Sequence, residues 1–317
     1  MYQRFSPLGV LMASDTGYFD LQVNGYAGVD FNGDGLLDDD LVAVCARLRR
    51  DGVAGILATV ISDQLGAMCG RLRRIAEICQ RSPDVRQMIW GVHIEGPFLN
   101  EAPGYVGAHP VAAMQPADGD SMRRLLDAAG GLTRLVTLAP ERDPGLGVTR
   151  MLAAQGIVVS AGHCDATRDE LLAAIDAGLS MFTHLGNGCP LLMPRHDNII
   201  QRVLSLSDKL WIGFIADGVH VPFVALRNYL QLAGPDRAII VTDAIAAAGM
   251  GPGVHQLAGQ RVVVDEHLAT WAADRSHLVG SAMTMPQAVE NLRVKLGYDK
   301  SKIAKLTCDN PRRALGI

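Results

Sequence analysis

Residues 55–93 read GILATVISDQLGAMCGRLRRIAEICQRSPDVRQMIWGVH, and they contain the unit that decides the fold. The unit begins with a short apolar run rich in β-branched residues, Gly55–Val60. A helical pattern follows over Leu65–Arg81, and a second apolar run, Met88–His93, ends the unit. Runs of this length and composition are typical of buried strands, so the stretch predicts a strand, a helix and a strand in succession.

The same alternation continues in both directions along the chain. Leu36–Asp51 and Pro222–Gly234 have helical patterns, and Thr167–Gly178 opens with a capping-box sequence and stops at glycine. The apolar runs predicted as strands are Phe19–Val23, Gly55–Val60, Met88–His93, Leu132–Leu138, Ile157–Ala161, Ser180–Thr183, Trp211–Ala216 and Ala238–Thr242. Eight strands with helices between them, over roughly 230 residues, predict an α/β fold of the (β/α)8 TIM-barrel type. A doubly wound sheet is the alternative, but Gly25–Gly28 lacks the GxGxxG pattern that commonly follows its first strand.

We expect a single domain over residues 1–317, because no linker or low-complexity tract divides the chain. Residues 1–18 form a short N-terminal extension in this interpretation. Residues 246–283 interrupt the alternation and are expected to form a loop and hairpin insertion near the active site. Residues 285–317 are expected to hold the C-terminal helices, over 285–297 and 300–306.

Composition excludes several classes of protein. With 49% hydrophobic and 20% charged residues, the 317-residue chain is too apolar to be disordered. Its net charge of −4 does not suggest nucleic-acid binding, and no apolar run of about 18 residues predicts a membrane span. The first 15 residues lack signal-peptide features, and the six cysteines are scattered without a CxxC pair. We therefore expect a cytoplasmic location.

Polar residues recur where the predicted strands end. Catalytic groups of such barrels lie at the carboxyl ends of the strands, so these residues are expected to converge on one site. They are Gln22, Asn24, Thr59, His93, Glu95, Glu141, His163, His184, Asp217, His220 and Asp243.

Three of these residues form a plausible metal-ligand set. Glu95, His163 and His184 offer one carboxylate and two imidazoles from three strand ends, which is a set typical of hydrolytic metal sites. Taken singly, Glu95 could be a solvated loop carboxylate, and each histidine could be a capping or core residue. Gln22 and Asn24 are neutral amides that bind such ions poorly, and no lysine ends a strand, so we expect one metal ion.

Asp243 follows the last predicted strand and is the candidate general acid and base. The alternative is that it caps a helix over Ala244–Ala248. His93 points to the same face as Glu95, two residues away, and either orients the metal site or fills the end of the barrel.

The motifs at these positions resemble those of the N-acetylglucosamine-6-phosphate deacetylase family of the amidohydrolase superfamily, in the family's order. The matching segments are Asp20–Gly25, His93–Phe98, Gly107–His109, Ala161–His163, Thr183–Leu185, Ala216–His220, Val241–Ala244, Gly280–Thr284 and Asp309–Pro311. The resemblance implies a metal-dependent amidohydrolase barrel that hydrolyses the acetamide of an N-acetylhexosamine phosphate, with N-acetylglucosamine 6-phosphate as the first candidate. It also implies a role in amino sugar metabolism and a homodimer in which neighbouring subunits complete the substrate site.

The resemblance also assigns roles to individual residues. It implies that Glu95, His163 and His184 hold one divalent ion, zinc in the first place, with iron, manganese or cobalt as alternatives. It makes Asp243 the acid and base that deprotonates water and then protonates the departing amine. The substrate contacts that it implies are His109, Asn187, Gly188, Arg195 and His220.

The sequence departs from the family pattern on the substrate loop. Thr183–Cys189 reads THLGNGC where the family has THx(F/Y)NAM, and Arg195 precedes His196-Asp-Asn198 rather than Glu-Pro-Gly. The short stretch before Asp20 further suggests that the family's small β-sandwich is reduced or absent. A different N-acyl amino sugar, a cyclic amide, or a sugar-binding role without catalysis are therefore alternatives.

Overall fold

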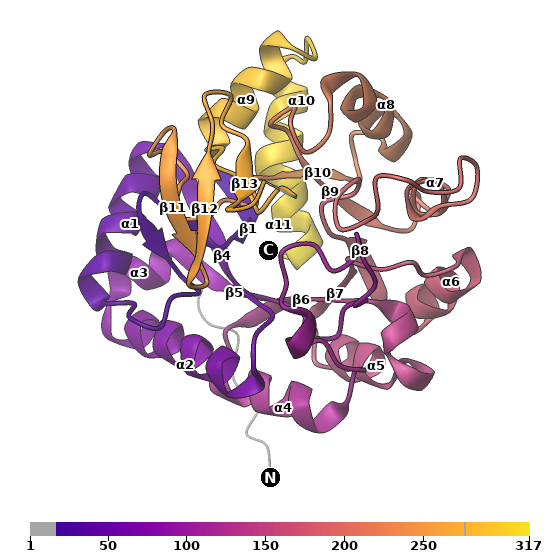
Figure 1. The fold of residues 1–317 in the computed structure, drawn as a ribbon, viewed down its shortest axis with the longest axis horizontal. Coiled ribbons are helices and arrows are strands. Elements are labelled where there is room, and N and C mark those ends of the chain that lie inside the picture. The colour runs from indigo at the N-terminus through magenta and orange to yellow at the C-terminus, as the bar shows by residue number, and fades with distance from the viewer. Residues whose placement is uncertain (1–16, 276) are drawn as a thin grey trace.

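The computed structural model describes residues 17–275 and 277–317, so most of the predicted N-terminal extension lies outside the described residues. Within these ranges, eight parallel strands pair in chain order to form a nearly closed barrel surrounded by helices (Figure 1). The strands are β1 (Tyr18–Val23), β4 (Val53–Ile61), β5 (Ile89–Glu95), β6 (Thr133–Leu138), β7 (Val158–Ala161), β8 (Leu179–Phe182), β9 (Trp211–Ile215) and β10 (Ala238–Val241). Each lies within two residues of its predicted bounds, so the barrel prediction is confirmed over the doubly wound sheet.

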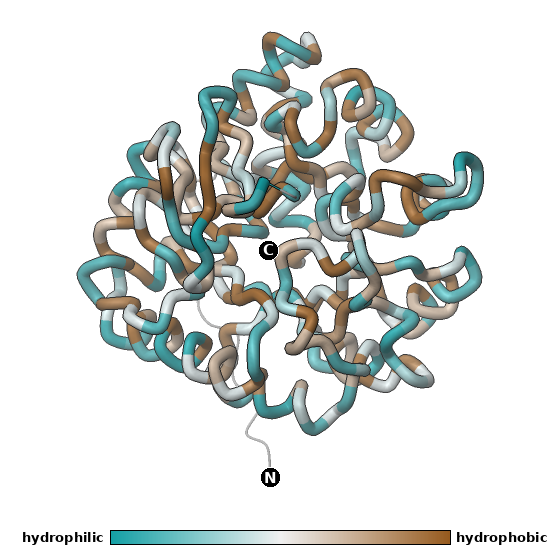
Figure 2. Tube along the Cα trace, viewed as in Figure 1, coloured by the Kyte–Doolittle hydropathy of each residue, from teal (hydrophilic) through white to brown (hydrophobic). Residues whose placement is uncertain are grey.

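Amphipathic helices cover the outside of the barrel, where hydrophobic and hydrophilic positions alternate along the chain (Figure 2). In α1 (Asp38–Arg50), three aspartates occupy the first turn and arginines the last, which suits the helix dipole. The other helices are α2 (Leu65–Arg81), α3 (Pro83–Met88), α4 (Gly119–Ala128), α5 (Gly147–Ala154), α6 (Arg168–Asp176), α7 (Ile199–Leu204), α8 (Phe223–Ala233), α9 (Met285–Val294), α10 (Lys300–Ala304) and α11 (Asn310–Leu315). Among the described residues, no helix is both long and apolar enough to span a membrane.

The C-terminal segment differs from its prediction. The predicted helix over 300–306 is α10, but the chain then makes a π-helical turn over Lys305–Asp309 and continues as α11. Pro311 occupies the first turn of α11, where its missing N–H costs nothing, so this proline begins a helix that the sequence analysis did not predict. Asn310 is buried and donates to the carbonyl of Ala238, which fixes the segment against the start of β10.

Residues 246–283 contain a small antiparallel sheet of β11 (Gly253–Leu257), β12 (Gln260–Val264) and β13 (Thr270–Ala272). A second apolar cluster joins this sheet to the barrel through Ile61, at the end of β4, and Ile245, just after β10. The small sheet therefore lies on the carboxyl-end side of the barrel (Figure 1). The remaining short strands, β2 (Gly25–Tyr26) and β3 (Val29–Asp30), pair with each other directly after β1.

Candidate metal-dependent active site

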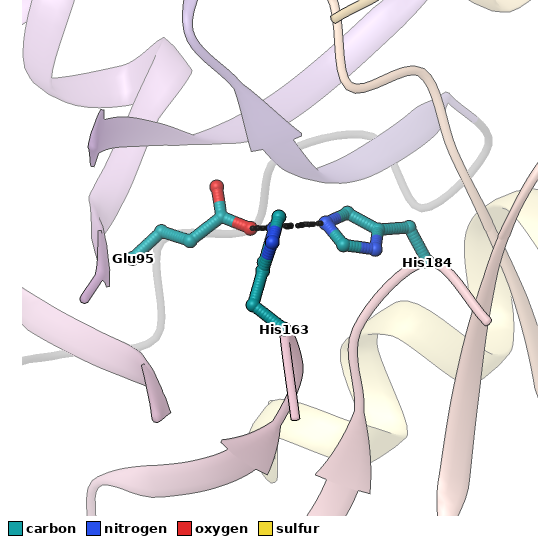
Figure 3. A group of neighbouring side chains, drawn as sticks. All are labelled: Glu95, His163 and His184. Carbon is teal, nitrogen blue, oxygen red and sulfur yellow. Dashed lines mark hydrogen bonds and ion pairs between the residues drawn. The ribbon is translucent and has the colours of Figure 1, made fainter. Parts of the chain in front are cut away.

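Three buried side chains, Glu95, His163 and His184, point toward one another at the carboxyl end of the barrel (Figure 3). Glu95 is the last residue of β5, and each histidine follows the end of its strand by two residues. Glu95 Oε1 lies 3.0 Å from His184 Nε2 and 3.4 Å from His163 Nε2. The two Nε2 atoms are 3.2 Å apart. The structure thus brings the whole predicted ligand set together.

The geometry of this cluster suits a divalent ion. Ligand atoms about 2.1 Å from a tetrahedral ion stand about 3.4 Å apart, which is close to the spacing of these three atoms. His163 Nδ1 lies 2.7 Å from the carbonyl oxygen of Tyr105, which can only accept a hydrogen bond. Nδ1 therefore carries the proton, and Nε2 keeps the lone pair that a metal requires. The cluster could bind a metal ion.

Charge within the cluster favours a cation. Burial alone would raise the pKa of Glu95, but its contacts with the His163 and His184 rings hold it well below its usual value. Burial alone would lower the pKa of His184, but the Glu95 carboxylate raises it. A buried anion thus attracts a proton to its neighbour, and a metal ion bound there would displace that proton.

Two glycines fix the position of the His163 ring. A Cβ atom on Gly107 would stand 2.9 Å from His163 Cε1, and one on Gly188 would stand 2.7 Å from His163 Nδ1. Both glycines have a φ of +59°, a backbone conformation that residues with a side chain rarely adopt. The loops after β5 and β8 therefore pack against this ring only because both positions lack a side chain.

The inner face of β1 contacts both carboxylates of the site. Gln22 Nε2 donates to Glu95 Oε1 and Oε2 at 3.2 and 3.1 Å, and Asn24 Nδ2 donates to Asp243 Oδ1 at 2.7 Å. Sequence reasoning treated these amides only as poor metal ligands and missed their role as donors. Their spacing of two residues, which places both on one face of a strand, is the signal that could have found it.

Asp243 is half-buried beside the cluster, and its pKa is raised to about 6. Burial is the main cause and the Glu95 charge adds to it, whereas His184 and His220 act in the opposite direction. The capping alternative is wrong, because no helix follows: Ala244 forms bridges with Val23 and Ser281, and residues 246–248 form a turn. A carboxyl group with a pKa near neutrality can both accept and return a proton.

The two further predicted histidines, His109 and His220, differ in their contacts. His109 is buried, its ring packs edge-on against His163 at 4.5 Å between centroids, and its Nδ1 lies 2.9 Å from the Ser62 hydroxyl. Burial, reinforced by His163, lowers the pKa of His109 to about 3, so its ring is neutral. His220 Nδ1 lies 2.6 Å from Asp217 Oδ2, and this contact fixes the orientation of its ring.

The predicted substrate loop is placed partly against the cluster. Asn187 Nδ2 donates to the carbonyl of His184 at 3.1 Å, and Gly188 lies against the His163 ring. Arg195 is exposed, and the structure assigns it no hydrogen bond or ion pair among the described residues. Its guanidinium is therefore available to a ligand, but the structure does not bring it into the cluster.

His93 belongs to the barrel interior rather than to the ligand group. Its Nε2 lies 2.7 Å from Thr137 Oγ1, which in turn lies 2.7 Å from Thr183 Oγ1. Burial is the main reason that its pKa falls to about 4, so this neutral ring fills the interior below the site. Glu141 also stays apart, because it accepts hydrogen bonds from Asn100 and from the Asp165 backbone.

Comparison with known proteins identifies close relatives, although no family model matches the chain. The N-acetylgalactosamine-6-phosphate deacetylase of Escherichia coli O157:H7 is 32% identical over 301 residues, which cover 95% of this chain and 77% of that protein. The N-acetylglucosamine-6-phosphate deacetylase of Bacillus subtilis is 30% identical over 303 residues, or 95% and 75% of the two chains. The Mycobacterium smegmatis N-acetyl-D-glucosamine-6-phosphate deacetylase, solved as a variant with N-acetyl-D-glucosamine-6-phosphate, superposes with a TM-score of 0.86 at 31% identity. That match covers 95% of this chain and 77% of the solved chain.

The parallel barrel and its cluster of one glutamate and two histidines define a metal-dependent hydrolase of the amidohydrolase class. The sequence identity and the shared fold each extend over 95% of the chain. The chain belongs to the N-acetylglucosamine-6-phosphate deacetylase family, whose members hydrolyse a linear amide.

Proposed function

We propose that this enzyme hydrolyses N-acetylglucosamine 6-phosphate to glucosamine 6-phosphate and acetate. The observation that carries the proposal is the half-buried Asp243 carboxyl, with a pKa raised to about 6, next to the group of Glu95, His163 and His184. A sugar-binding protein without catalysis would have no use for an acid and base held there. The family to which the chain belongs supports the choice of substrate.

We infer that Glu95, His163 and His184 hold one zinc ion. One carboxylate and two imidazoles with an open position are a common catalytic set for zinc, although iron, manganese or cobalt would accept the same ligands. The Gln22 and Asn24 amides are engaged with carboxylates, which leaves no ligand set for a second ion at the end of β1. When bound, the ion would polarise the acetyl carbonyl and the attacking water.

The residues of the chain supply the proton transfers. The Asp243 carboxylate, which accepts the hydrogen bond from Asn24, takes up a proton as water attacks the acetyl carbon. The same carboxyl then gives that proton to the nitrogen as the C–N bond breaks, so acetate and the amine leave and Asp243 returns to its starting state. The Asn24 bond holds the carboxyl during both transfers.

Five residues are proposed as substrate contacts. His109 and His220 each have one ring nitrogen engaged within the protein, which leaves the other for the sugar phosphate. Asn187 and Gly188 lie on the loop that packs against the cluster, and the exposed Arg195 supplies a charge for the phosphate. The sequence identity of 32% with the Escherichia coli N-acetylgalactosamine-6-phosphate deacetylase makes N-acetylgalactosamine 6-phosphate the second candidate substrate.

We also propose a cytoplasmic homodimer. Leu191 and Leu192 are almost fully exposed, at 102% and 92%, on the same loop as Arg195. Two adjacent exposed leucines are unfavourable in water, and a second subunit would cover them beside the substrate site. Sedimentation at micromolar concentration is expected to give a dimer; a monomer with full activity would contradict this.

A substrate panel tests the proposed function. The metal-loaded enzyme is offered N-acetylglucosamine and N-acetylgalactosamine, each with and without a 6-phosphate, together with a cyclic amide, and the released amine or ring-opened product is measured. We expect the highest kcat/KM for N-acetylglucosamine 6-phosphate. A preference for the galactose epimer would favour the second candidate, and no hydrolysis of any compound would refute the proposal.

A further inference from the structure

Asp20 is a fully buried carboxyl group to which the proposed mechanism gives no role. It lies on the inner face of β1, 3% exposed, two residues before Gln22. Its Oδ2 accepts the hydroxyl hydrogen of Thr242 at 2.6 Å, and its Oδ1 accepts the backbone N–H of Thr242 at 3.2 Å. The same oxygen accepts the N–H of Gln22 at 3.2 Å. Asp20 thus binds the residue directly before Asp243.

These hydrogen bonds join β1 to β10, the two neighbouring strands of the barrel that do not pair through a ladder of backbone hydrogen bonds in the described residues. We call the junction between these two strands the seam. β1 and β10 are the two ends of the eight-stranded sheet in the described residues, whereas β10 pairs with β9 along its whole length. Past the end of β10, Val23 and Ala244 form a bridge, and the backbone N–H groups of Asn24 and Gly25 donate to the Ala244 carbonyl at 2.7 and 3.1 Å. The Asp20 carboxylate takes the place of the missing backbone acceptor for the Thr242 N–H. At the level of Thr242, directly before Asp243, the Asp20 side chain therefore joins the two strands.

Through its hydroxyl group, Thr242 connects Asp20 to the residues on both sides of Asp243. Its Oγ1 donates to Asp20 and accepts the N–H of Ala244 at 3.1 Å, so it ties together the residues before and after Asp243. Between them, Asp243 has a φ of +52°, in the left-handed region that a residue with a side chain adopts only under restraint. The Asp243 carbonyl accepts the N–H of Ser281, which fixes the opposite side of the same turn.

We propose that Asp20 is a positioning residue for Asp243: through Thr242 it holds the end of β10 against β1 and keeps the Asp243 carboxyl in the place where it transfers protons. The inference rests on the proposed function for the role of Asp243, but the geometry of the seam does not depend on it. A shift of about 1 Å in a catalytic group can cost about 10²-fold in rate. Asp20 therefore acts on turnover without touching the substrate.

The experiment compares variants at the seam with matched variants elsewhere. Asp20→Ala and Thr242→Val remove the bond, whereas Asp20→Asn and Thr242→Ser keep a partner for it. The control pair is Asp143 and Thr149, in which a buried aspartate likewise accepts a threonine hydroxyl, at 2.8 Å, and backbone N–H groups. Asp143→Ala and Thr149→Val lower stability in the same way but lie outside the site.

We expect Asp20→Ala and Thr242→Val to lower kcat about 10²-fold with KM and metal content little changed. Asp20→Asn and Thr242→Ser should stay within about tenfold of the unmodified enzyme, and the control variants should keep its kcat. If Asp20→Ala fails to fold, the comparison of Thr242→Val with Thr242→Ser tests the same bond. Equal kcat in the seam and control variants would overturn the proposal.

Crystal structures give a readout that needs no substrate. In Thr242→Val we expect the Asp243 carboxyl to move by about 1 Å and to lose its bond to Asn24, whereas Thr149→Val should leave both in place. An unmoved Asp243 in Thr242→Val would overturn the proposal even if the substrate panel failed. A moved Asp243 would support it independently of which sugar the enzyme hydrolyses.

Discussion

Replacing Gly188 by alanine should weaken metal binding, although Gly188 is not a ligand. The new Cβ would stand 2.7 Å from Nδ1 and 3.0 Å from Cγ of His163, so the imidazole ring must move. Moving it breaks the 2.7 Å bond from Nδ1 to the Tyr105 carbonyl, which sets the tautomer of the ligand. Loss of such an orienting bond costs about 10- to 100-fold in metal affinity, or about 1.4 to 2.7 kcal/mol.

The backbone contribution must be separated from this effect. Alanine at a φ of +59° adds about 1 to 2 kcal/mol of strain to the folded state whatever lies nearby. Gly145→Ala is the matched control, because Gly145 has a φ of +63° and its Cβ would meet nothing within 4 Å. Thermal melting should show similar destabilisation of both variants. Competition with a chelator should show weaker metal binding in Gly188→Ala alone; equal metal affinity in the two variants would refute the reasoning.

Three further predictions concern the metal and the proton carrier. Asp243→Asn should lower turnover by about two to four orders of magnitude while metal content stays normal, whereas His184→Asn should lose metal and activity together; near-normal turnover of Asp243→Asn would make the mechanism wrong. Because Asp243 acts first as a base, kcat/KM should fall as the pH drops through the pKa of its carboxyl group, about 6. A bound cation would favour the carboxylate and move this fall to a somewhat lower pH. A flat profile of kcat/KM from pH 7 to pH 4 would contradict this role. Elemental analysis should find one divalent ion per chain held by Glu95, His163 and His184, and two ions that are both needed for activity would exclude the single-metal site.

Sequence patterns predicted the barrel because each strand is a short apolar run separated from the next by a recognisable helix. The predicted helix over Leu65–Arg81 agrees with α2 to the residue, and the capping box at Thr167 is present in the structure. The C-terminal end was predicted less well, since Pro311 is compatible both with the end of a helix and with the first turn of the next one. A local sequence signal cannot decide between two structures when the same residue is favourable in both.

The composition of the site was also predictable, but its connections were not. The ends of parallel strands meet at one face, so Glu95, His163 and His184 could be grouped without a structure. The bonds from Gln22 and Asn24 to the two carboxylates depend on how β1 sits relative to β5 and β10, which span more than 200 residues of sequence. Such contacts follow from barrel closure, and no window of the sequence contains both partners.

The direction of the site residues depends on a further feature, the backbone conformation after each strand. Thr183 and Thr242 face the barrel interior, where their hydroxyls bond with interior side chains. In an extended strand the next residue would point to the opposite face, toward the helices. His184 and Asp243 follow them with φ of +33° and +52°, and His163 stands at the corresponding position after β7 with +50°. The left-handed backbone conformation breaks this alternation of side-chain direction, so each of these side chains points to the carboxyl end of the barrel instead. Each such residue costs roughly 1 to 2 kcal/mol, a strain that the loops and the seam must offset to keep the three side chains convergent.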